Sequence, residues 1–159
     1  MKRIGIILFL TFSLLLTTPA LIGQCQYQTV GGLLMTNIGA IAGVTNLGPV
    51  YGDLQGSVAA TILGQDSNGS FRVQHYWVNA AGETILFGVA VLKPVATSDP
   101  NVVAALWGNY VSPIIGGTGK YKNATGSLQY FGLADFAKNT LVLRYSGWVC
   151  LRPPSATNQ

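Results

Sequence analysis

Charged side chains are scarce in this sequence. Asp, Glu, Lys and Arg together make up 9% of its 159 residues, whereas about a quarter is usual in a soluble domain. The formal net charge is +4, and Lys2 and Arg3 supply two of those positive charges. The remaining basic residues are scattered rather than clustered, which argues against a nucleic-acid partner.

Metal-binding and acid–base residues are rarer still. His75 is the single histidine, and it is accompanied by only two cysteines and five acids. There is no Cys/His cluster with metal-ligand spacing and no pair of carboxylates at glycosidase spacing. We therefore expect no metal and no cofactor. Asp53, directly before a predicted strand, is the one candidate general acid, and a plain turn residue is the alternative.

The one long apolar run lies at the N-terminus. Lys2 and Arg3 precede the run IGIILFLTFSLLL, and small residues with Pro19 follow it. This order is typical of a secretory signal peptide, and the run is short for a membrane span. We assign residues 1–23 to this signal, with cleavage after Ala20 or Gly23. Lipid attachment at Cys25 and an uncleaved anchor are the alternatives. The expected location is extracellular, or periplasmic or on the cell envelope if the organism is bacterial.

The rest of the chain predicts one domain over residues 24–150 and a flexible tail over residues 151–159. In an oxidising compartment Cys25 and Cys150 predict a disulfide that joins the two ends of the domain, and free or separately paired thiols are the alternative. Asn68 and Asn123 begin Asn-x-Ser/Thr sequons, which would carry glycans in a eukaryotic host.

No amphipathic helical pattern persists beyond residue 24. Apolar runs rich in β-formers are instead separated by Gly, Asn, Asp and Pro, which predicts an all-β domain. The predicted strands are Thr29–Met35, Ala40–Thr45, Gln55–Leu63, Ser70–Val78, Thr84–Lys93, Ala105–Ile115, Thr125–Ala134 and Thr140–Val149. About eight strands at this spacing indicate a sandwich or a closed barrel.

The alternation of side chains separates inner from outer positions. Phe71, Val73, His75 and Trp77 share the apolar face of one predicted strand. The strand TILFGVAVL, residues 84–92, is apolar on both faces, so one face is expected to lie against something outside the barrel. We therefore expect a homo-oligomer.

The glycine-rich stretch at residues 116–126 has two interpretations. A phosphate-binding loop needs Gly-x4-Gly-Lys-Ser/Thr before a helix, but Ile114 and Tyr121 occupy two of the required positions and no helix follows. A sharp bend at the end of a barrel, with Tyr121 packing across it, fits better.

The stretch Ile115-Gly-Gly-Thr-Gly-Lys-Tyr121, followed by Ala124-Thr-Gly126, resembles a signature shared by dirigent proteins and allene oxide cyclases. It is more similar still to small secreted bacterial proteins with that barrel. The resemblance extends over residues 52–150, and Asn123 stands where glycine is common. It implies an eight-stranded antiparallel, calycin-like β-barrel with a central cavity for an apolar molecule. Dirigent proteins steer the coupling of phenoxy radicals, and allene oxide cyclases close a ring by holding their substrate's shape. Neither uses a metal or cofactor.

Three functions follow as hypotheses. The first is binding of a small apolar or aromatic molecule, with dirigent-like steering of its reaction. The others are a cofactor-free cyclase or isomerase, and a non-catalytic structural or interaction barrel. Whether the protein is an enzyme stays open, because the chain departs from both families outside the signature. The candidate ligand-lining residues are His75, Trp77, Asn109, Tyr130 and Tyr145. For His75 a hydrogen-bonded core role is the more common one beside Trp77 on an apolar face, and a polar group that orients a ligand hydroxyl or carbonyl is the alternative.

Overall fold

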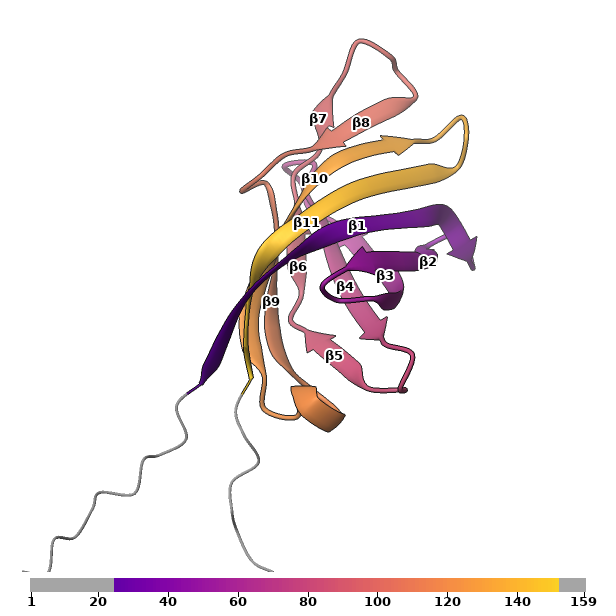
Figure 1. Cartoon of the computed structure of the whole chain (residues 1–159). Coiled ribbons are helices and arrows are strands. Elements are labelled where there is room, and N and C mark those ends of the chain that lie inside the picture. The colour runs from indigo at the N-terminus through magenta and orange to yellow at the C-terminus, as the bar shows by residue number, and fades with distance from the viewer. Residues whose placement is uncertain (1–24, 152–159) are drawn as a thin grey trace, which may run out of the picture.

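A computed structural model describes residues 25–151 of the chain. The predicted signal peptide and residues 152–159 of the predicted tail lie outside this part. Strands make up almost all of it (Figure 1). They are β1 (Gln26–Ile41), β2 (Thr45–Gly52), β3 (Gly56–Gln65), β4 (Phe71–Val78), β5 (Thr84–Phe87), β6 (Ala90–Leu92), β7 (Val95–Ala96), β8 (Val102–Ala105), β9 (Tyr110–Gly117), β10 (Thr125–Asp135) and β11 (Thr140–Leu151). A single turn of 3₁₀ helix, η1 (Gly119–Tyr121), follows β9. No helix within residues 25–151 is long and apolar enough to cross a membrane.

The strands form one closed antiparallel barrel. β1, β2, β3 and β4 pair in chain order, and β11 pairs with both β10 and β1, which closes the sheet. Between β4 and β10, two of the strand positions around the barrel are each occupied by short strands laid end to end. β5, β6 and β7 occupy one of these strand positions, and β8 and β9 occupy the other. Counted this way the barrel has eight strand positions, so the predicted eight-stranded antiparallel barrel is confirmed.

The predicted strand over Ala40–Thr45 is wrong. β1 continues to Ile41, and a turn over residues 42–44 leads into β2, a strand that the sequence does not predict. Gly48 and Pro49 gave β2 the composition of a loop. A Cβ on Gly48 would lie 2.0 Å from the carbonyl oxygen of Met35, so glycine there allows β1 and β2 to approach closely.

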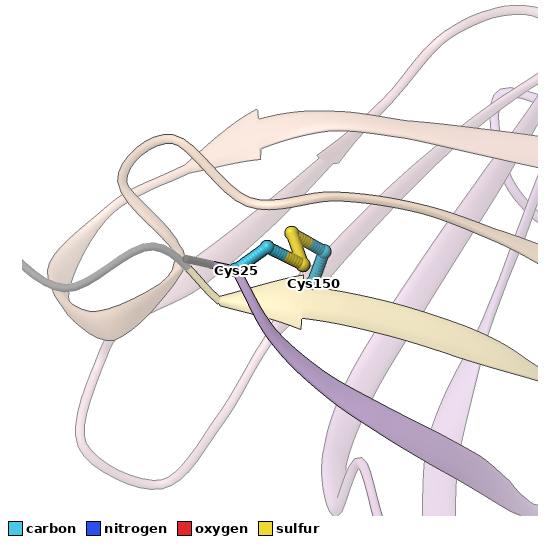
Figure 2. Close-up of a disulfide and its surroundings, with 2 residues drawn as sticks. All are labelled: Cys25 and Cys150. Atoms are coloured by element: carbon cyan, nitrogen blue, oxygen red, sulfur yellow. A yellow bond between two sulfur atoms is a disulfide. The ribbon is translucent and has the colours of Figure 1, made fainter. Parts of the chain in front are cut away.

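The two ends of the barrel domain are joined covalently. Cys25 and Cys150 form the predicted disulfide, with their Cα atoms 5.3 Å apart (Figure 2). Cys25 immediately precedes β1, and Cys150 lies near the end of β11, the strand with which β1 pairs. The bond therefore fixes the seam that closes the barrel. We call this end of the barrel the disulfide end and the opposite end the distal end. β11 continues to Leu151, the first residue of the predicted tail.

The glycine-rich stretch closes the disulfide end. Tyr121 of η1 is buried against the core, as predicted. The Thr118 Oγ1 atom lies 2.8 Å from the backbone nitrogen of Thr84, from which it accepts a hydrogen bond. A carboxylate oxygen of Glu83 accepts a hydrogen bond of 3.0 Å from the backbone nitrogen of Lys120. These contacts tie η1 to the start of β5, so the stretch serves as a structural end cap.

Candidate functional site

Alternate residues of each strand point into the barrel, as the sequence predicts. On β4 the buried residues are Val73, His75 and Trp77, and on β11 they are Leu143, Tyr145, Val149 and the disulfide-bonded Cys150. β5 and β6 place Ile85, Phe87 and Ala90 inside. The inner side chains from all eight strand positions form one contiguous core.

Aromatic rings fill the lumen from its centre to the disulfide end. The ring centroids of Trp77 and Tyr145 lie 5.2 Å apart, and those of Trp77 and Phe87 lie 5.6 Å apart. The His75 ring stacks on Tyr130 at 5.3 Å. Four of the five predicted ligand-lining residues are therefore brought together inside the barrel. All four of these residues, His75 included, pack against other aromatic rings.

His75 holds the centre of the lumen through two hydrogen bonds. Its Nε2 atom lies 2.7 Å from the hydroxyl of Tyr110, and its Nδ1 atom lies 3.0 Å from the hydroxyl of Ser112. Tyr110 and Ser112 are alternate residues of β9, so both point inward. Every polar atom of this imidazole has a partner, and His75 thus has the hydrogen-bonded core role that the sequence favours.

Burial keeps this cluster uncharged. His75 is 2% exposed, and burial lowers its pKa from 6.5 to about 3. Burial, together with the neighbouring Tyr130, raises the pKa of Tyr110, and burial raises that of Tyr130 as well. Neutral imidazole donates from one nitrogen and accepts at the other. In either tautomer the Tyr110 hydroxyl keeps a further hydrogen-bonding capacity beyond its bond to His75.

Three other candidate residues have local structural roles. The Tyr145 hydroxyl accepts a hydrogen bond from the backbone nitrogen of Leu54 and donates one to the carbonyl of Tyr51. Asp53 is exposed, and its carboxylate accepts a 2.8 Å hydrogen bond from the backbone nitrogen of Gly31. Asn109 is half-buried in the turn between β8 and β9, outside both strands.

The distal end of the lumen is packed differently. Two cavities of about 20 Å³ each remain between the residues there. The small residues that line the cavities are Thr36, Asn46, Ala60, Ala104, Ala105 and Ala134. Tyr110, Leu141 and Leu143 line both cavities and so form the partition between them. A cavity of this size holds about one water molecule. Each of these two cavities is therefore too small for the apolar molecule that the family resemblance implies.

Thr36 is the unusual residue of this distal site. It is 4% exposed, and its hydroxyl has no hydrogen-bond partner among residues 25–151. It lines the same cavity as Asn46, His75 and Tyr110. A buried hydroxyl without a partner costs free energy and requires an explanation in a native structure.

The sequence did not single out most of the distal-site residues. Thr36, Asn46, Leu141 and Leu143 carry no motif. The alternation of Tyr110, Ser112 and Ile114 would have placed these three on one inner face. Their pairing with His75, however, depends on a barrel register that one sequence does not give. Asn68 and Asn123 are exposed in turns, and their glycosylation stays a prediction. Within residues 25–151 no three His, Cys, Asp or Glu side chains are grouped so as to hold a metal ion.

Comparisons with known proteins find similarity to solved structures. No family model and no curated protein matches the chain. The solved structure of a pterocarpan synthase dirigent protein aligns with 86% of this chain and 96% of its own, at 14% identity and a TM-score of 0.38. The barrel assignment rests on the strand pairing described above, and membership of the dirigent family stays a prediction.

Proposed function

We propose that this protein is an extracellular barrel that binds a small apolar or aromatic molecule at its distal end. The observation that carries the proposal is the partition. Two cavities lie side by side, separated by Tyr110, Leu141 and Leu143. Tyr110 and Leu143 are buried, whereas Leu141 is half-buried, so we take Leu141 as the residue that a ligand would displace.

Displacement of the Leu141 side chain would merge the two cavities into one, which would also include the space that this side chain had occupied. An apolar cavity of about 150 Å³ is sufficient to bind benzene. We therefore expect a ligand with about one ring, held between alanine-rich walls above the His75–Tyr110 pair. The described residues that line the two cavities include no charged group. Steering by shape, as in the family that the sequence resembles, suits this lining better than acid–base turnover.

An extracellular location is part of the proposal. A disulfide between Cys25 and Cys150 is typical of oxidising compartments. The predicted signal peptide supports the same location.

Substitution of Leu141 tests the proposal. Leu141→Ala removes the movable part of the partition, so benzene should bind about 10-fold more tightly than to the wild type, as measured by methyl chemical-shift titration. Val142→Ala is the matched control, because Val142 is the next residue of β11 and is 39% exposed on the outer face. Equal benzene affinity in Leu141→Ala and Val142→Ala, or no binding in either, would contradict the proposal.

A second candidate function is self-association, and the outer surface favours it. Tyr76 pairs with Leu86 across β4 and β5, and Val91 pairs with Val111 across β6 and β9. These four side chains are 38–54% exposed, and together they form an apolar outer face. Next to Tyr76 and Leu86 the surface has an apolar hollow of about 270 Å³. Such a face is typical of a protein-binding surface, and it is the one from which the sequence predicts a homo-oligomer.

A further inference from the structure

The unpartnered hydroxyl of Thr36 restricts the chemistry of the ligand. We infer that the distal site takes an uncharged molecule with one oxygen, an alcohol or a ketone, and that the Thr36 hydroxyl recognises this oxygen. The inference rests on the proposed function and names the ligand class of the same site.

The first argument is the position of Thr36. Its hydroxyl is buried, lacks a partner among the described residues, and belongs to a side chain that lines the cavity. Leu34, Val58 and Ala60 line the same cavity, so most of the surrounding wall is apolar. A ligand oxygen would replace the hydrogen bond that folding removes from this hydroxyl.

The cavity beside Thr36 is lined by few other polar side chains. Asn46 and Tyr110 contribute the other polar side chains of this cavity apart from His75. Both imidazole nitrogens of His75 are engaged by Tyr110 and Ser112, while the Tyr110 hydroxyl keeps one further capacity. Thr36 and Tyr110 line the same cavity, and each hydroxyl has capacity for a hydrogen bond with a ligand oxygen; Tyr110 donates this bond when His75 Nε2 carries the proton, and otherwise accepts it from an alcohol.

The lining of the two cavities also limits the charge that a ligand can carry. Neither cavity is lined by Lys, Arg, Asp or Glu. Burial of an ionised carboxylate or ammonium without a partner costs far more than one hydrogen bond returns. An acid or an amine is therefore excluded from this site, whereas a neutral oxygen is accommodated.

The test compares cyclopentanol with cyclopentane, a matched pair that differs by one hydroxyl. In the wild type, cyclopentanol should bind about 10-fold more tightly, which is the size of one buried hydrogen bond. Thr36→Val keeps the shape of the side chain and removes its hydroxyl, so the ratio of the two affinities should fall to about 1 or below, because the buried ligand hydroxyl loses its partner. Thr36→Ser keeps the hydroxyl and should keep the ratio. Methyl chemical-shift titration gives each affinity.

The outcomes separate the inference from the proposed function. If both probes bind the wild type equally, or if Thr36→Val keeps the preference, the inference is overturned while binding at the distal site stands. Equal binding would mean that water alone partners Thr36. If neither probe binds the wild type or Leu141→Ala, the site itself is absent and both statements fail.

Discussion

The stability of the protein should fall as the pH is lowered through the range in which an ordinary histidine becomes charged. Burial lowers the pKa of His75 from 6.5 to about 3, so the imidazole stays neutral in the folded barrel. The unfolded chain binds a proton below pH 6.5, and the folded chain does not. Stability that is present above pH 6.5 is therefore lost progressively down to about pH 3.

The size of the loss follows from one proton. Each pH unit below 6.5 costs about 1.4 kcal/mol, so lowering the pH from 7.5 to 5.0 should reduce the unfolding free energy by about 2 kcal/mol. The pKa values of Glu83 and Asp135 are lowered by hydrogen bonds, chiefly to Lys120 and Lys138 respectively. Their ordinary values are 4.5 and 3.8, so their contribution changes mainly below this window.

Guanidinium denaturation, followed by tryptophan fluorescence at each pH, measures this loss. His75→Gln is the control variant, and its unfolding free energy should be nearly flat between pH 7.5 and 5.0. In the wild type, the NMR signals of the His75 ring should not shift over the same range. A wild-type stability that does not change, an equal slope in His75→Gln, or a ring that titrates near pH 6.5 would refute the reasoning.

Three further predictions concern the frame around the site. Replacing Cys25 and Cys150 with alanine should lower the unfolding free energy by roughly 2–5 kcal/mol in denaturant titration, because the disulfide closes a loop with a sequence separation of 125 residues; an unchanged midpoint would contradict this. Tyr145→Phe leaves the Leu54 nitrogen without its partner and should cost about 1–3 kcal/mol in the same assay, whereas Tyr76→Phe, on the exposed face, should cost little. Leu86→Lys should shift any oligomer toward monomer in sedimentation velocity, and an unchanged oligomer would remove this face from the interface.

The sequence predicted the fold well wherever strands alternate clearly. On β4 the predicted inner residues Val73, His75 and Trp77 are buried and Phe71 is half-buried, since no glycine or proline interrupts the pattern. β2 was missed because Gly48 and Pro49 have the composition of a loop, although glycine serves there to bring two strands together. Local composition cannot distinguish these two uses of glycine.

The candidate site was only partly predictable. The burial of His75 followed from its strand, but its partners Tyr110 and Ser112 lie 35 and 37 residues further along the chain. The register that aligns them belongs to the closed barrel. Asn109 was expected to line the lumen because residues 105–115 were predicted as one strand. A turn at residues 106–109 interrupts that strand, with a hydrogen bond from the Asn109 nitrogen to the Leu106 carbonyl.

The proposed binding at the distal end is tested most directly by native mass spectrometry on protein isolated from its own host and then denatured in the same run. We expect a discrete mass in complex with the folded protein, released on denaturation, that belongs to a neutral molecule of about one ring with one oxygen. The variant Leu141→Phe, whose larger side chain would occupy the two cavities, should carry no bound mass, whereas the variant Val142→Phe should still carry it. A folded protein that carries no bound mass, and stays empty after incubation with cyclopentanol and benzene, would contradict the account and favour the self-associating barrel.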